Sequence, residues 1–131
     1  MTHQCKNVLV ACEDFRMVKN HVNWADHTLG DRNYDLVTAG GSQKAIVDET
    51  TRDSILKWIG IGVDLHKANM VVIIAHEDCG AYGGSSAFND WDEEKAKYVE
   101  DMNTAEGLIK TNFSVEVKKF VMMLDGTIEE I

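Results

Sequence analysis

Basic residues are scarce in this sequence: 13 lysines and arginines face 22 acidic residues, which gives a net charge of −9. Such a surface repels phosphate backbones and acidic membrane surfaces, so the charge argues against a nucleic-acid or membrane partner. A membrane-spanning run is also lacking, since no apolar stretch approaches the roughly 20 residues that a bilayer requires. Proline is absent altogether, which is uncommon but indicates no function.

A secretion signal is lacking as well. The order of basic region, apolar core and small-residue cleavage site that marks a signal peptide is not found in the opening residues, MTHQCKNVLVACEDF. We therefore expect a cytoplasmic protein, in which thiols stay reduced. Under these conditions each of the three cysteines is more often a metal ligand or a reactive group than half of a disulfide.

What the sequence does contain is a regular alternation of apolar runs and helical periodicity. Its length of 131 residues and its 44% hydrophobic content predict one domain over residues 1–131. Short apolar runs predict strands over 7–12, 34–41, 68–76 and 114–124, with a short return strand over 128–131. Helical spacing and capping residues predict helices over 15–29, 48–66 and 92–112.

This order of elements predicts an α/β fold with a mostly parallel sheet, a strand order of the 2-1-3-4 type and helices on both faces. Functional groups in such sheets collect beyond the carboxyl ends of the strands. Cys12 and His76 both stand at predicted strand ends, and Cys79 follows shortly after His76. If the strands 7–12 and 68–76 are neighbours, these three side chains converge.

Two thiolates and one imidazole form a donor set that zinc accepts. Three protein ligands leave the fourth tetrahedral position open, which suits a catalytic zinc, so we expect one Zn²⁺ per chain on Cys12, His76 and Cys79. Cys5 cannot complete the set, because seven residues of strand separate it from Cys12 by roughly 23 Å at about 3.3 Å per residue. The main alternative is a reversible disulfide between Cys12 and Cys79.

An acid and a base follow Cys12 at alternate positions in the stretch VACEDFR. A fork-type pair between them lets Asp14 accept the proton of zinc-bound hydroxide and direct a lone pair at a substrate, while Arg16 fixes Asp14. We expect Asp14 and Arg16 to be catalytic. Asp14 is also close enough in sequence to occupy the fourth zinc position itself. The default alternative is a surface ion pair at the start of a helix.

Two motifs together resemble the signature of β-class carbonic anhydrases. They are C-x-D-x-R at residues 12–16 and H-x-x-C-G at residues 76–80. The strand and glycine turn at 34–41 and the closing strand and turn at 117–131 are similar to the same family. The resemblance therefore covers most of the chain.

The resemblance implies an α/β fold and reversible hydration of CO2 to bicarbonate by zinc hydroxide. It also implies dimers or higher oligomers, and we expect a homodimer. The residues that it assigns as ligands and as the dyad match those proposed above: Cys12, His76, Cys79, Asp14 and Arg16. In some members the aspartate of the dyad closes the zinc site in an inactive state, and Asp14 has the same option.

The substrate pocket is where the sequence departs from the family. Candidate substrate-binding residues are Phe15, Ala39, Gly40, Gly41 and Gly80. Phe15 adds apolar bulk near the metal, and the turn lacks the arginine and asparagine that the family often carries around Ala-Gly. A narrower, more apolar pocket favours hydrolysis of carbonyl sulfide or carbon disulfide, the reactions of related proteins with the same zinc set. The non-enzymatic alternatives are a zinc- or bicarbonate-binding regulatory domain and a thiol-based redox module.

The remaining titratable residues have no assigned role at this stage. His21, His27 and His66 are expected to be ordinary surface or partly packed residues, with proton shuttling as the alternative. Cys5 is expected to be structural. The run DWDEEKAK at 90–97 is expected to be a solvated helix start, with its acidic residues near the helix N-terminus.

Overall fold

The computed structural model describes residues 3–131. Its strands are β1 (Asn7–Ala11), β2 (Tyr34–Thr38), β3 (Met70–His76), β4 (Glu116–Met122) and β5 (Ile128–Glu130). Its α-helices are α1 (Val18–Ala25), α2 (Gln43–Val47), α3 (Arg52–Asp64) and α4 (Trp91–Asn112). Within residues 3–131, none of the helices combines the length and apolar character needed to cross a membrane.

The five strands form one sheet in the order β2-β1-β3-β4-β5. The first four strands are parallel, and β5 runs antiparallel to β4. This confirms the predicted fold class and strand order, together with the short return strand. Every residue of β1 is buried, as the run NVLVA predicts for a strand that is covered on both faces.

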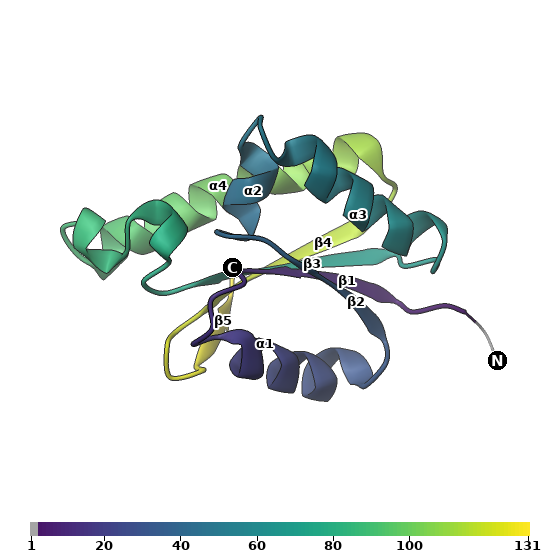
Figure 1. Ribbon diagram of the computed structural model, residues 1–131, viewed down its shortest axis with the longest axis horizontal. Coiled ribbons are helices and arrows are strands. Elements are labelled where there is room, and N and C mark those ends of the chain that lie inside the picture. The colour runs from purple at the N-terminus through teal and green to yellow at the C-terminus, as the bar shows by residue number, and fades with distance from the viewer. Residues whose placement is uncertain (1–2) are drawn as a thin grey trace.

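Helices cover both faces of the sheet. Figure 1 shows α1 on one face and α2, α3 and α4 on the other. Leu9 packs toward α1 with Met17, whereas Val10 packs with Ile59 of α3 on the opposite face. The crossover after β1 and the crossover after β2 therefore run on opposite faces. This places the change of direction between the neighbouring strands β1 and β3, where α/β sheets bind ligands.

Three predicted elements differ from the structure by more than two residues at one end or both, and the others differ by one or two. The predicted helix 15–29 is α-helical only from Val18 to Ala25, and a π-helical turn follows it. The predicted strand 34–41 ends at Thr38, and the predicted helix 48–66 is the shorter α3. The helix α2 was not predicted, because five residues are too few to display a helical period.

Candidate metal centre

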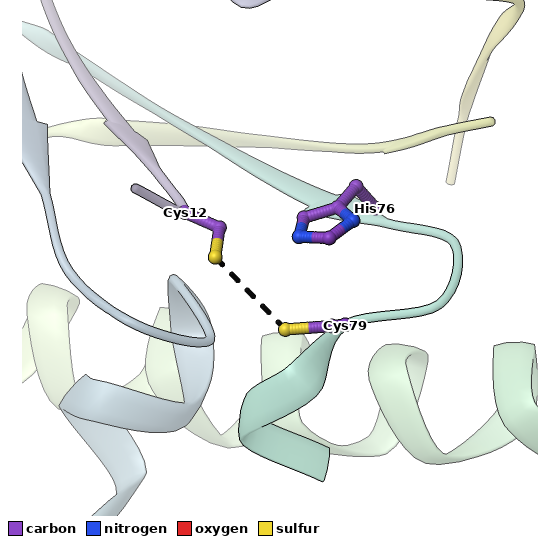
Figure 2. Close-up of side chains that lie close together, drawn as sticks. All are labelled: Cys12, His76 and Cys79. Atoms are coloured by element: carbon purple, nitrogen blue, oxygen red, sulfur yellow. Dashed lines mark hydrogen bonds between the residues drawn. The ribbon is translucent and has the colours of Figure 1, made fainter. Parts of the chain in front are cut away.

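Three ligand-type side chains meet at the carboxyl ends of β1 and β3. Cys12 follows the last residue of β1, His76 is the last residue of β3, and Cys79 lies three residues further on. All three side chains are buried, and their donor atoms lie within 4.8 Å of one another. Figure 2 shows them pointing at a common centre. The Cys12 and Cys79 sulfurs lie 4.0 Å apart.

The imidazole of His76 is oriented so that a metal could bind its Nε2. Its Nδ1 lies 2.7 Å from the carbonyl oxygen of Glu77, which can only accept a hydrogen bond, so Nδ1 carries the proton. Its Nε2 is buried and has no hydrogen-bond partner among residues 3–131. In the neutral ring the lone pair therefore lies on Nε2, on the side that faces Cys12 (Figure 2).

The two thiols carry negative charge unequally. The pKa of Cys12 is lowered, because the thiol of Cys79 and the backbone N–H of Gly41 donate hydrogen bonds to its sulfur. The pKa of Cys79 is raised, since it donates to the Cys12 thiolate and is buried. A second thiolate at this place needs a cation to compensate its charge, which is what a coordinated metal provides.

The donor set fits zinc. Two sulfurs bound tetrahedrally at a Zn–S distance of about 2.3 Å lie roughly 3.8 Å apart. The observed separation of 4.0 Å is close to that value and is twice the S–S bond length of about 2.05 Å. Both cysteines are free. The geometry thus suits a metal between the sulfurs better than the alternative disulfide.

Asp14 and Arg16 form an ion pair at the edge of this cluster. The guanidinium of Arg16 donates hydrogen bonds to both carboxylate oxygens of Asp14. It also donates to the carboxylate and to the backbone carbonyl oxygen of Asp78. The Arg16 hydrogen bonds lower the pKa of Asp14 to about 2, so its carboxylate is ionised at neutral pH. Its Oδ2 lies 3.8 Å from Nε2 of His76, which brings the carboxylate to the rim of the cluster.

A buried hydrogen-bond network fixes the loop that carries Cys79. Glu94 of α4 is 2% exposed and accepts hydrogen bonds from the N–H of Asp78 and the hydroxyl of Tyr98, both at 2.7 Å. The Tyr98 oxygen in turn accepts from the N–H of Cys79 at 3.3 Å. Glu94 thus corrects the expectation of a wholly solvated helix start. The spacing of Glu94 and Tyr98, four residues apart, could have predicted this burial, because it continues the buried face of α4 toward the N-terminus of the helix.

The comparisons with known proteins identify the family of this chain. A family model described as "Putative carbonic anhydrase" matches residues 2–131. The chain belongs to this carbonic anhydrase family. The resemblance drawn from the two sequence motifs is thereby confirmed.

This carbonic anhydrase family member is also similar to curated relatives and to solved structures. It is 28% identical over 136 residues to an uncharacterized protein of Rickettsia conorii, covering 98% of this chain and 73% of the relative. A tetrameric β-carbonic anhydrase of Sordaria macrospora superposes with a TM-score of 0.69 at 14% identity, covering 97% and 80% of the two chains. An apo carbon disulfide hydrolase superposes with a TM-score of 0.60 at 12% identity, covering 98% and 79%. At these identities both structures show the fold alone.

The expected substrate-binding residues lie at different distances from the metal cluster. The N–H of Gly41 reaches the Cys12 sulfur at 3.4 Å. Ala39 and Gly40 line a separate cavity of about 150 Å³ between the turn and α3. Phe15 is 88% exposed, and Gly80 is exposed beside Cys79. Gly41 thus contacts a ligand-type residue through its backbone, and substrate binding by all five residues remains a prediction.

Three of the histidines outside the cluster differ from one another. His27 is exposed and His66 is partly buried beside Asp35, which are the positions expected for these two residues. His21 is 2% exposed, and its ring lies 6.3 Å from that of His76, so the expectation of a surface or partly packed position was wrong for this residue. Burial lowers the pKa of His21 to about 4, which keeps it neutral at physiological pH.

Proposed function

We propose that this carbonic anhydrase family member catalyses the reversible hydration of CO2 to bicarbonate, with one Zn²⁺ held by Cys12, His76 and Cys79. The observation that carries the proposal is the buried Nε2 of His76, which has no hydrogen-bond partner in residues 3–131 and lies beside two free thiols. A zinc ion bound there supplies a Lewis acid that lowers the pKa of water from about 15.7 toward 7.

Asp14 is the residue proposed to orient the reaction. Its ionised carboxylate can only accept hydrogen bonds, so it accepts one from the attacking water and turns a lone pair of that oxygen toward the carbon of CO2. Arg16 holds both carboxylate oxygens and thereby limits the rotation of Asp14. The same carboxylate lies 3.8 Å from His76, which supports a resting state in which Asp14 closes the metal site.

The test is stopped-flow CO2 hydration on protein of known zinc content, followed from about pH 6.5 to 9 around the expected titration of water. We expect turnover that rises with pH, disappears in Asp14→Ala with zinc retained, and disappears in Cys79→Ser with zinc lost from this site. Cys5→Ser is the matched cysteine control and is expected to retain turnover, because Cys5 lies at the other end of β1.

Full zinc occupancy without CO2 turnover would reject the proposal. The same protein is then assayed with carbonyl sulfide and carbon disulfide, the substrates of the alternative hydrolase. Zinc binding without turnover of any of these substrates would favour the regulatory domain. The ring of Phe15 is exposed, so within this chain it does not narrow the space beside the metal cluster. We therefore propose CO2 as the substrate ahead of carbonyl sulfide and carbon disulfide.

We also propose a cytoplasmic homodimer that pairs through β2, since a cytoplasmic setting keeps the site thiols reduced. β2 is an edge strand, and edge strands present unpaired backbone groups to a second chain. Leu36 on β2 is 43% exposed and Trp58 on α3 is 47% exposed, and both line a surface cavity of about 330 Å³. An apolar surface beside an unpaired strand edge supports self-association.

Analytical ultracentrifugation tests the dimer. Leu36→Glu is expected to shift the protein to monomers, because it places a charge on the proposed interface. Leu124→Glu is the matched control, since Leu124 is also exposed but follows β4 rather than lying on the β2 edge. A monomeric wild-type protein, or equal behaviour of the two variants, would count against pairing through β2.

A further inference from the structure

A second group of metal-ligand side chains lies at the opposite end of the sheet. Cys5 precedes β1, Asp35 belongs to β2, and His66 follows α3. Their donor atoms all lie within 4.8 Å of one another, and each residue is partly buried. Thiol, carboxylate and imidazole from three separate chain segments therefore meet at one place.

This group is independent of the first centre. Cys5 and Cys12 flank the same strand, and seven residues of extended chain separate them by roughly 23 Å at about 3.3 Å per residue. The first centre lies at the carboxyl ends of the strands, whereas Cys5 lies at the amino end of β1. No ligand can be shared between the two places.

Backbone and side-chain contacts hold the second group together. The N–H of Cys5 donates to the carbonyl oxygen of His66 at 3.0 Å, which ties the segment before β1 to the loop after α3. Nδ1 of His66 lies 2.5 Å from Oδ2 of Asp35. The ring of His3 packs 4.6 Å from the ring of His66, so a fourth donor stands beside the group.

The site is open to solvent. His3, Cys5, Asp35 and His66 line a cavity of about 340 Å³ at the surface, and the cationic Arg32 lines it as well. Burial and the neighbouring Asp35 carboxylate raise the pKa of Cys5, because a thiolate there would be poorly solvated and would repel Asp35. A divalent cation reverses both effects, since it binds the thiolate and offsets the carboxylate charge.

We propose that Cys5, Asp35 and His66 form a second metal site, with His3 as the fourth ligand. The mixed sulfur, nitrogen and oxygen donors suit a borderline-soft divalent ion that accepts four ligands, which is the chemistry of Zn²⁺ and of its spectroscopic substitute Co²⁺. A metal here joins the segment before β1 to β2 and to the loop after α3. Its role would be structural, because its ligands come from separate chain segments at the end of the sheet opposite the first centre.

Cobalt titration of Cys12→Ser/Cys79→Ser tests this site in isolation. The double variant keeps Cys5 as its only cysteine, so any thiolate-to-cobalt absorption must come from Cys5. We expect one Co²⁺ per chain with such absorption, and its loss when Cys5→Ser is added. His66→Ala or Asp35→Asn in the same background should weaken cobalt binding at least about tenfold. Removal of a residue that only supports a metal ligand already lowers metal affinity by about 10- to 100-fold, so removal of a ligand should cost at least the lower of these values.

Two results would overturn the proposal. One is the absence of thiolate-to-cobalt absorption, and the other is an affinity that His66→Ala and Asp35→Asn both leave unchanged, which would mean adventitious binding to a single thiol. His27→Ala is the matched control, since His27 is exposed and outside the group.

A measurement on the wild-type chain covers the case in which the double variant fails to fold. Alkylation of each cysteine is followed by peptide mass spectrometry, with and without Zn²⁺. Zinc is expected to slow the alkylation of Cys5 in the wild type but not in His66→Ala. Equal Cys5 alkylation rates with and without zinc in the wild type would reject the site.

Discussion

Arg16 holds Asp14 through two parallel hydrogen bonds, from Nε to Oδ1 at 3.1 Å and from Nη2 to Oδ2 at 2.7 Å. The backbone N–H of Arg16 adds a third bond to Oδ1 at 2.8 Å. The same guanidinium reaches Asp78, whose neighbour Cys79 is a proposed ligand. The position of the carboxylate relative to the metal centre is therefore set by the planar fork of an arginine.

Arg16→Lys tests this relationship, because lysine keeps the charge but lacks the fork. We expect kcat/KM for CO2 hydration to fall about 100-fold, the loss typical of a reacting group displaced by about 1 Å, with zinc content unchanged. Stopped-flow assays paired with metal analysis make the measurement. Arg32→Lys, at an exposed arginine with no contact to the centre, serves as the control. Wild-type turnover in Arg16→Lys would contradict the positioning role.

Tyr98→Phe tests the network behind Cys79. The change removes only a hydroxyl, yet it leaves the buried N–H of Cys79 without its acceptor and takes one donor from Glu94. We expect a loss of about 1–3 kcal/mol in the free energy of unfolding, the usual cost of stranding a buried polar group. Zinc affinity should fall about 10- to 100-fold, as for other outer partners of metal ligands.

Urea unfolding and competition with a chelator measure the two effects of Tyr98→Phe. Tyr34→Phe is the matched control, because its hydroxyl also donates to a carboxylate at 2.7 Å, that of Asp26, but at the surface. If both variants lose the same stability and retain the same zinc affinity, the Tyr98 network does not support the centre.

The order of the sheet could be predicted because strong local patterns agree with general chain rules. The runs in β1 and β3 are apolar except for Asn7 and His76, and right-handed crossovers leave few ways to arrange parallel strands. The same logic placed Cys12 and His76 at adjacent strand ends. The exact ends of α1 and α3 and the existence of α2 depend on turns and tertiary packing, which periodicity does not report.

The side chains behind the proposed ligands could not be predicted in the same way. Glu94 and Tyr98 act on residues 16 and 19 positions earlier in the chain, so no local spacing links them to the motif. The group of Cys5, Asp35 and His66 draws on three segments in the same manner. Such groupings depend on how α4, β2 and the loop after α3 are positioned, which the sequence pattern alone leaves open.

Two glycines in helices give a matched test of the packing between α3 and the sheet. A Cβ added at Gly62 would lie 2.4 Å from Cγ2 of Val8 and 2.9 Å from Oδ2 of Asp35. Because Val8 is buried in the sheet, Gly62→Ala is expected to lower the free energy of unfolding by about 1–3 kcal/mol, the range for overpacking.

Gly107→Ala is the control for this substitution. Gly107 lies on α4 with nothing within 4 Å of an added Cβ, so the change should raise stability by about 0.5–1 kcal/mol through helix propensity alone. Urea unfolding of the two variants compares the effects directly. Equal stabilisation of both would show that α3 moves away from β1 at little cost.

The buried imidazole of His21 predicts how stability depends on pH. Burial lowers its pKa to about 4 in the folded chain, whereas an unfolded histidine titrates near 6.5. Between these values the unfolded chain binds a proton that the folded chain does not. The free energy of unfolding therefore falls as the pH drops from about 6.5 to about 4, by on the order of 3 kcal/mol from this residue.

His21→Gln removes this titration while it keeps a polar side chain. Urea unfolding of metal-free protein at about pH 6.5 and about pH 4.5 should show a smaller acid-induced loss in His21→Gln than in the wild type, because the variant side chain takes up no proton on unfolding. His27→Gln is expected to lose as much as the wild type, since His27 is exposed in the folded chain. If His21→Gln loses stability in parallel with the wild type, His21 is protonated in the folded chain and burial does not hold it neutral.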